Sequence, residues 1–173
     1  MDAMKCLLER RSIRSFTDRE IDRADLEKIV EAAYHAPSAM NRQEWQFTVV
    51  RKLNVIERLA DVLREKLNRD KGYNFYKPNV LILCSINRDN PHGTEDCAVA
   101  MENIMLAAHS LGIGSVWINQ FKGVCDDENV RKELKNIGIP DNHIVCGTAA
   151  LGYASDDAVR NFAKNADVVK WVE

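Results

Sequence analysis

The chain has 173 residues, with 24 basic and 26 acidic side chains and a formal net charge of −2. This length fits one domain with a single hydrophobic core and leaves little room for a second. Hydrophobic residues make up 46% and charged residues 29% of the chain, an ordinary globular composition that excludes disordered and fibrous classes. The two charge signs balance and no basic face is evident, which argues against a nucleic-acid-binding protein.

The composition also bears on compartment and metal content. The longest apolar runs, such as VLILC at 80–84, are far shorter than a bilayer span, and the first residues lack the hydrophobic stretch of a secretion signal. We therefore expect a cytoplasmic protein without a membrane segment. The five cysteines are widely spaced without a C-x-x-C pair, and the four histidines share no ligand spacing. We predict no metal site and mostly buried, structural thiols.

The first half of the chain predicts three helices and one strand. Apolar residues recur at three- and four-residue intervals over 4–10, 23–35 and 54–67, as in amphipathic helices, and Asp22 is a suitable N-cap for the second. The segment WQFTVV, 45–50, is rich in β-branched and aromatic residues and predicts a strand.

The second half begins with a polar, aromatic loop or lid at 68–78, followed by a fully buried strand at 79–86. A helix over 94–111, ended by Gly112, has only a narrow polar edge. It is therefore either the centre of the domain or half of a dimer interface. The remaining elements are a strand at 113–118, a helix at 126–138 and a buried strand at 143–153.

Helices and strands alternate from end to end, without repeats, linkers or low-complexity tracts. This order predicts a single α+β domain over residues 1–173, with α/β-like layering in three layers. We expect a central mixed β-sheet with helices on both faces.

The segment RRSIRSF, 10–16, concentrates positive charge. If it is extended, Arg10, Ser12 and Arg14 share one side, and Arg11 lies with Ile13 on the other. Guanidinium groups flanking a hydroxyl suit the phosphate of a nucleotide cofactor. The alternative is that these arginines follow a helix, where cations stabilise its C-terminal end and Glu9 offers an ion pair, each contributing about 0.3 to 1 kcal/mol.

Two further stretches are candidates for a site. The loop PSAMNRQEW, 37–45, offers Ser, Asn and Gln side chains that can pair with the edge of a heterocycle, although an ordinary loop uses the same residues. In LGIGSVWINQF, 111–121, the Gly-x-Gly follows a helix instead of opening one, which is the wrong context for a dinucleotide fingerprint. We expect these glycines to end the helix and to let the backbone approach something flat.

Together the three stretches resemble the FMN-dependent nitroreductase family, in the same order over most of the chain. The family's R-R-S-x-R segment is similar to Arg10, Arg11, Ser12 and Arg14. The resemblance places the first three at the FMN phosphate and Arg14 at the N1/O2 edge of the flavin ring. A fixed cation there would raise the tendency of the ring to accept a hydride.

The same resemblance implies an intertwined homodimer with FMN sites at the subunit interface. The family's P-S-S-x-N-x-Q-P-W loop, which reaches across to the partner's flavin, is similar to Pro37, Ser38, Ala39, Asn41, Gln43 and Trp45. Two departures are Ala39, in place of the second Ser, and Glu44, in place of Pro. Residues 96–118 resemble the family's dimer helix and the start of the following loop. That likeness sets the segment Trp117, Ile118, Asn119 and Gln120 near the ring, with the backbone N–H groups around the last two facing N5.

Other positions are less specific. The family often supplies basic C-terminal residues to the phosphate, for which Arg160 is the candidate, whereas Lys164 is more typical of a solvated surface charge. Tyr73, Phe75 and Tyr76 either roof an aromatic substrate or pack the 68–78 loop onto the domain. Packing is the favoured interpretation, with Phe75 and Tyr76 kept as substrate-side candidates.

The resemblance implies an oxidoreductase in which NAD(P)H delivers a hydride to FMN and a small aromatic nitro compound, a quinone or a similar acceptor takes the electrons in a ping-pong cycle. No catalytic side chain is then required, because FMN carries the chemistry. The alternative is a non-catalytic FMN-binding or redox-sensing protein on the same fold. A third possibility is reduction of another acceptor, such as an enone or a halogenated aromatic.

Overall fold

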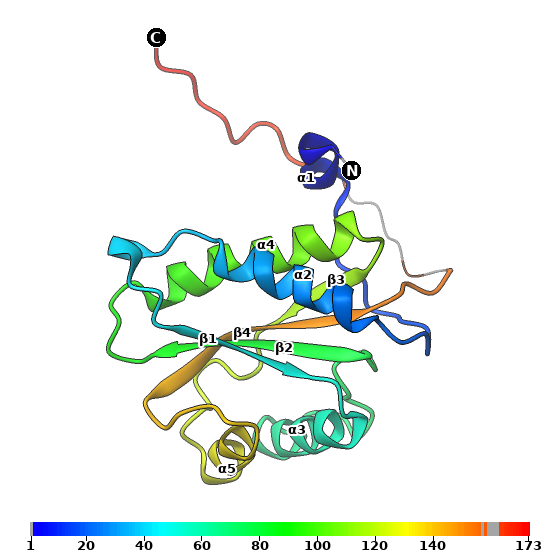
Figure 1. Cartoon of the computed structure of the whole chain (residues 1–173), viewed down its shortest axis with the longest axis vertical. Coiled ribbons are helices and arrows are strands. Elements are labelled where there is room, and N and C mark those ends of the chain that lie inside the picture. The colour runs from blue at the N-terminus through cyan, green and yellow to red at the C-terminus, as the bar shows by residue number, and fades with distance from the viewer. Residues whose placement is uncertain (1, 157, 159–162) are drawn as a thin grey trace.

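A four-stranded sheet lies between two layers of helices in the computed structural model, which describes residues 2–156, 158 and 163–173 (Figure 1). Helices α2 and α4 cover one face of the sheet, and α3 and α5 cover the other. This arrangement confirms the α+β class with helices on both faces. The elements are α1 (Ala3–Glu9), α2 (Arg23–Tyr34), a 3-10 helix (Ala39–Asn41), β1 (Trp45–Val50), α3 (Leu53–Lys66), β2 (Val80–Asn87), α4 (Gly93–Ser110), β3 (Gly114–Ile118), α5 (Glu128–Asn136) and β4 (His143–Gly152).

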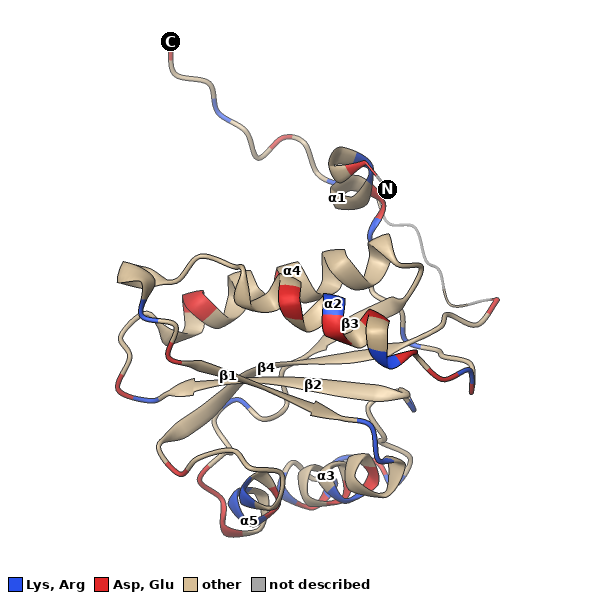
Figure 2. Cartoon of the chain, viewed as in Figure 1, with Lys and Arg blue, Asp and Glu red and all other residues tan. Residues whose placement is uncertain are grey.

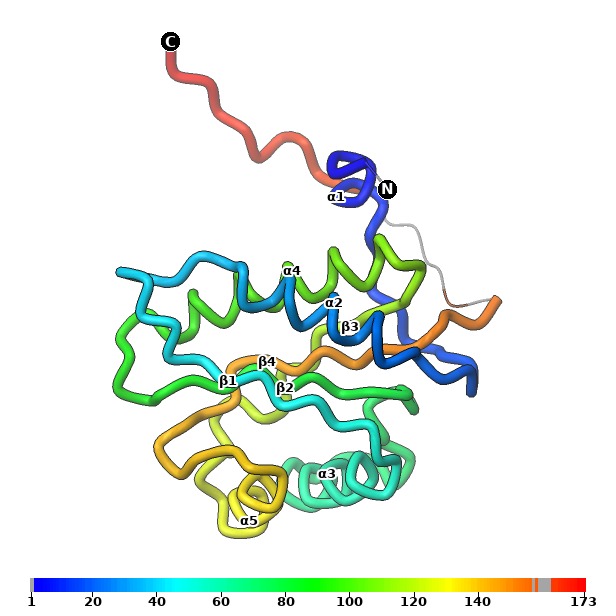
Figure 3. The backbone as a smooth tube through the Cα atoms, viewed as in Figure 1, coloured from blue at the N-terminus to red at the C-terminus, as the bar shows by residue number. Residues whose placement is uncertain are grey.

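The strand order is β1-β2-β4-β3, and every neighbouring pair of these strands is antiparallel. The expected mixed sheet is therefore corrected: the parallel pairing in the described residues is an isolated bridge between Ser12 and Ser115. The reason lies in the connection after α3. Val50 pairs with Leu81, so β2 starts where β1 ends, and segment 67–79 returns the chain to that end of the sheet (Figure 3).

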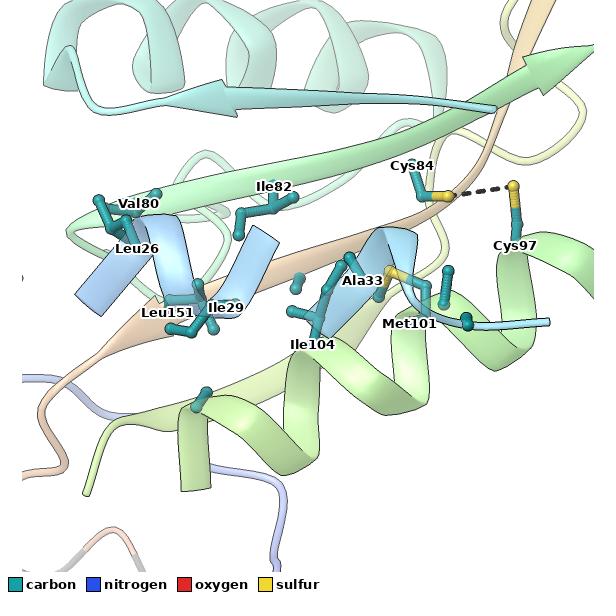
Figure 4. Packing of buried hydrophobic residues seen from close by; sticks show 14 of the residues in the cluster. Leu26, Ile29, Ala33, Val80, Ile82, Cys84, Cys97, Met101, Ile104 and Leu151 are labelled. Atoms are coloured by element: carbon teal, nitrogen blue, oxygen red, sulfur yellow. Dashed lines mark hydrogen bonds between the residues drawn. The ribbon is translucent and has the colours of Figure 1, made fainter. Parts of the chain in front are cut away.

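Side chains alternate along the strands and build two cores. On the α2/α4 side, Ile82 packs with Ile29 of α2 and with Met101 and Ile104 of α4 (Figure 4). On the other side, Leu83 packs against α3 and α5. Helices α2 and α4 pack side by side on this face, and α4 contacts both α2 and the sheet, as expected of a helix at the centre of the domain. No helix in the described ranges has the length and apolarity to cross a membrane.

A β-bulge interrupts the pairing of β2 with β4. The register shifts after Cys84, leaving Cys146 without a partner, so that Cys146 and Gly147 both face α4. Cys84 Sγ and Cys97 Sγ are 3.1 Å apart (Figure 4). Hydrogen bonding to Cys97, together with burial, raises the pKa of the Cys146 thiol. All five cysteines are free and buried, which confirms the prediction of structural thiols.

Candidate functional site

The arginine segment lies along the outer edge of β3. Ile13 N donates to Ser115 O at 2.9 Å, while β4 occupies the opposite edge of the strand. A Cβ on Gly114 would lie 3.0 Å from three side-chain atoms of Ile13, so glycine permits this close approach. Gly112, with φ of 74°, ends α4 as predicted. Gly114 thus lets the backbone of β3 approach the side chain of Ile13, where a flat ligand was expected.

Arg10 and Arg11 are only partly satisfied. Arg10 Nε is 3.5 Å from Glu102 Oε1, and Arg11 Nη1 donates to the carbonyls of Leu8 at 2.7 Å and Arg10 at 2.8 Å. Arg11 therefore serves the end of α1, as in the helix-end alternative, while the acidic neighbour is Glu102 rather than Glu9. Arg10 Nη1 and Arg11 Nε are buried without a partner in the described residues. An unpaired buried donor costs about 1 to 3 kcal/mol, and an anion would remove that cost.

Arg14 is exposed, and its neighbour Ile13 is buried, as an extended segment predicts. The Arg14 Cζ atom lies 6.0 Å from the centroid of the Tyr76 ring. At that distance the cation–π attraction is weak, about 0.5 kcal/mol. Arg14 and Tyr76 therefore share one exposed patch, and Ser12 lies half-buried between Arg14 and the two earlier arginines.

Phe75 does not belong to that patch. It is fully buried on the α3/α5 side, with its ring centroid 5.3 Å from Tyr73 and 6.2 Å from Phe121. The packing alternative holds for Phe75, because a ring enclosed on all sides cannot contact a bound substrate. Burial also raises the pKa of the Tyr73 hydroxyl.

The C-terminal end of β3 presents backbone donors. Within the described part of the chain, the N–H groups of Asn119 and Gln120 donate no hydrogen bond. Trp117 packs on the α4 side, where an ideal Cβ on Gly147 would lie 3.0 Å from its Nε1, and Ile118 is buried on the opposite face. The arginine segment lies at the start of β3, and these backbone donors follow its end. Because β3 is roughly 13 Å long, the two groups are separated by about that distance along the strand.

The loop 37–43 lies elsewhere. Ala39 N donates to Asp96 Oδ1 at 2.8 Å, which fixes the loop at the N-terminal end of α4. Met40, Asn41 and Gln43 have φ of 54°, 54° and 51°, a left-handed geometry that is uncommon for such residues. The arginine segment lies farther along the chain's α4, with Arg10 beside Glu102 and Ile13 on Ser115 after the C-terminal end of the helix. Within one chain, the structure therefore does not bring these two predicted parts of the site together.

Arg160 lies outside the described residues, and Lys164 is exposed. The residues with described positions contain no group of three or more His, Cys, Asp or Glu side chains able to hold a metal ion.

Two residues gain importance from the structure alone. Asp96 is an acidic residue in the first turn of α4, and its side chain is buried and holds the 37–43 loop. Glu102 was not singled out, and it lies beside Arg10. Polar residues within the otherwise apolar 94–111 helix were the available signal, because such residues usually have a specific partner.

The chain is similar to known proteins over nearly its whole length. The profile described as the nitroreductase family matches residues 7–83 and 71–153. A protein of Archaeoglobus fulgidus, named as an NADH dehydrogenase/NAD(P)H nitroreductase, is 36% identical over 164 residues, covering 90% of this chain and 87% of its own.

Solved structures agree with the sequence comparison. A nitroreductase with bound FMN from Bacteroides fragilis superposes with a TM-score of 0.93 at 33% identity, covering 100% of both chains. One from Desulfitobacterium hafniense, also with bound FMN, gives a TM-score of 0.89 at 26% identity, again covering 100% of both chains. The chain belongs to the nitroreductase family and has its fold.

Proposed function

We propose that this protein is an FMN-dependent oxidoreductase that uses NAD(P)H to reduce nitroaromatics, quinones or similar acceptors. The observation that carries the proposal is the pair of buried guanidinium nitrogens, Arg10 Nη1 and Arg11 Nε, that have no partner in the described residues. Arginine donors match phosphate oxygens in both geometry and charge. The Bacteroides fragilis relative, which aligns over the whole chain, carries bound FMN.

The chain's own residues take three roles in this proposal. Arg10, Arg11 and Ser12 bind the phosphate, and Arg14 holds positive charge at the N1/O2 edge of the ring. The backbone N–H groups of Asn119 and Gln120 donate towards N5. Bound FMN supplies the redox chemistry by taking a hydride from NAD(P)H and passing the electrons to the second substrate. The exposed Tyr76, beside Arg14, is the remaining candidate for contact with an aromatic acceptor.

The site is proposed to be completed in a homodimer. In one chain the 37–43 loop is fixed at the N-terminal end of α4, whereas the arginine segment runs from Glu102 to Ser115, so a second copy would bring a loop to each arginine segment. Residues 163–173 run away from the domain (Figure 1). They carry apolar side chains that are 60% to 88% exposed, namely Val168, Val169, Trp171 and Val172. Exposed apolar surface of this kind is typical of contact with another chain.

The test is to purify the protein, record its visible spectrum and mass in solution, and mix it anaerobically with NADH or NADPH in a stopped-flow instrument. We expect a yellow dimer whose flavin absorbance bleaches with at least one of the two donors. Bound flavin that neither donor reduces would favour the non-catalytic alternative. A colourless monomer that does not take up added FMN would contradict the proposal as a whole.

A panel of oxidised acceptors then separates the possible substrates. We expect reoxidation of the reduced flavin by nitroaromatics or quinones. Selective turnover of an enone or a halogenated aromatic would instead assign the same apparatus to another acceptor class.

A further inference from the structure

The carboxylate of Asp96 is buried at the start of α4. Its residue is 4% exposed, and no salt bridge to it is found among the described residues. Oδ1 accepts from Ala39 N at 2.8 Å, and Oδ2 accepts from Asn90 Nδ2 at 3.4 Å. The first turn of a helix favours negative charge, so an acidic side chain suits this position at the start of α4. A buried charged acceptor makes a stronger hydrogen bond than a neutral one.

The loop that Asp96 holds is conformationally strained. Met40, Asn41 and Gln43 all have left-handed backbone geometry, with φ between 51° and 54°. Such residues persist only where surrounding contacts determine their conformation. Burial does not do so here, because Met40 at the apex of the loop is 72% exposed.

The other hydrogen bonds of residues 38–43 are internal. Asn41 N donates to Ser38 O at 2.9 Å, Gln43 N donates to Ser38 Oγ at 3.1 Å, and Gln43 Nε2 donates to Asn41 Oδ1 at 2.8 Å. They shape the loop without fixing it to the domain. In the described part of the chain, the hydrogen bond from Ala39 N to Asp96 is the one that links residues 38–43 to another element.

We propose that Asp96 is a positioning residue that fixes the 38–43 loop in the conformation in which it contacts the flavin. This rests on the proposed function, since the loop has a ligand to contact only if FMN binds. Asn90 orients Asp96 from behind: its Nδ2 donates to the carboxylate, and its Oδ1 accepts from His92 N at 2.9 Å.

The experiment compares Asp96→Ala with Glu95→Ala, a matched control that removes an exposed acid from the same helical turn. Two readouts are used: FMN affinity by titration of the apo-dimer, and hydrogen exchange of the Ala39 amide in the apoprotein. For Asp96→Ala we expect FMN affinity to fall by about 10- to 100-fold and exchange at Ala39 to accelerate by a similar factor. Glu95→Ala should leave both unchanged.

A reciprocal swap protects the test against simple misfolding. Asp96→Asn alone leaves two amide groups facing each other as donors, at positions 90 and 96. Combining it with Asn90→Asp restores an acceptor for every donor: the introduced carboxylate accepts from the new amide, whose oxygen still accepts from Ala39 N. We expect the single change to weaken FMN binding and the double change to restore it to within about threefold of the parent.

The outcomes separate the two proposals. Failure of the parent protein to bind FMN would reject the proposed function, whereas exchange at Ala39 would still test the anchor. Weaker FMN binding with an unchanged Ala39 amide would overturn the positioning role, as would a double variant no better than Asp96→Asn alone. Faster exchange at Ala39, weaker FMN binding and rescue by the swap would together support it.

Discussion

Charged side chains are mostly paired on the α3/α5 layer and only partly paired in the arginine segment 10–14. Figure 2 shows acidic and basic residues intermixed along α3 and α5, whereas α4 is mostly uncharged. Ion pairs tie the α3/α5 layer together: Arg58 with Glu133 at 3.2 Å, Lys66 with Asp127 at 2.8 Å, and Arg131 with Asp126 at 3.1 Å. In the arginine segment, by contrast, the one ion pair among the described residues is a longer contact, from Arg10 to Glu102 at 3.5 Å.

The paired charges of the α3/α5 layer stabilise the fold, whereas the arginine segment is suited to binding a ligand. Exposed ion pairs each contribute about 0 to 1 kcal/mol, so the α3/α5 layer gains modest stability and needs no ligand to complete it. Buried guanidinium donors without a partner are destabilising until an anion arrives. The buried guanidinium nitrogens without a partner in the described residues therefore mark the place where an anionic cofactor is expected.

The largest effect on FMN binding is expected when the arginines are removed. Arg10→Ala combined with Arg14→Ala should lower FMN affinity by at least about 100-fold, because two charge-assisted contacts are lost. Titration of apoprotein with FMN measures the loss, circular dichroism shows whether the fold survives, and sedimentation shows whether the proposed dimer survives. Arg58→Ala, on the α3/α5 layer, is the control and should bind FMN normally. Full flavin occupancy in the double variant would contradict the assignment.

A smaller effect is expected from moving the segment rather than its charges. Gly114→Val would place methyl groups where a Cβ already lies 3.0 Å from the Ile13 side chain, and should push residues 12–14 away from β3. Such overpacking costs about 1 to 3 kcal/mol, so FMN affinity should fall roughly tenfold or more. Gly72→Ala, with nothing within 4 Å of the new Cβ, is the control. Equal FMN affinity in the two variants would contradict the role given to Gly114.

Much of the fold was predictable because its elements follow local rules. The strand predicted at 45–50 has those bounds, and helices predicted at 23–35 and 94–111 end within one residue of α2 and α4. Hydrophobic periodicity reports which face of an element is buried, and that is a property of neighbouring residues. The direction in which two strands pair is not a property of neighbouring residues, because it depends on the end of the sheet to which the 67–79 connection returns the chain. The mixed sheet was therefore wrong.

The residue clusters of the candidate site could be predicted from the sequence, but the contacts of the individual side chains could not. Clustered arginines are visible in the sequence, but the return of Arg11 to the end of α1 depends on where that helix stops. Nothing in the pattern around Phe75 distinguishes a buried ring from an exposed one, because its stacking partner Phe121 lies far along the chain. The same applies to Asp96 and Ala39, whose contact joins residues 57 positions apart.

Acid pH should destabilise the α3/α5 side of the molecule, where Arg131 of α5 donates a hydrogen bond to the carbonyl of His143. Burial, assisted by Arg131, lowers the pKa of His143 below its usual 6.5. The unfolded chain therefore binds this proton more readily than the folded chain, so the free energy of unfolding falls as pH drops through about 6.5. His143→Gln should flatten urea-unfolding stability between pH 7 and pH 5, while exposed His35→Gln should keep the parent's slope. Parallel slopes for all three proteins would contradict this role.

The smallest effect is expected at Asp126, which accepts from both Arg88 and Arg131. These hydrogen bonds, Arg88 first, hold the pKa of Asp126 below its usual 3.8. Its stabilising contribution is therefore present above pH 3.8 and is lost as pH falls through the lower, folded-state value. Asp126→Asn should lower the melting temperature slightly at pH 7, and the difference should shrink at pH 2 to 3 and in 1 M salt. FMN affinity should not change, because the paired layer completes itself without the cofactor. A melting difference that persists in high salt would instead indicate that Asp126 acts through packing.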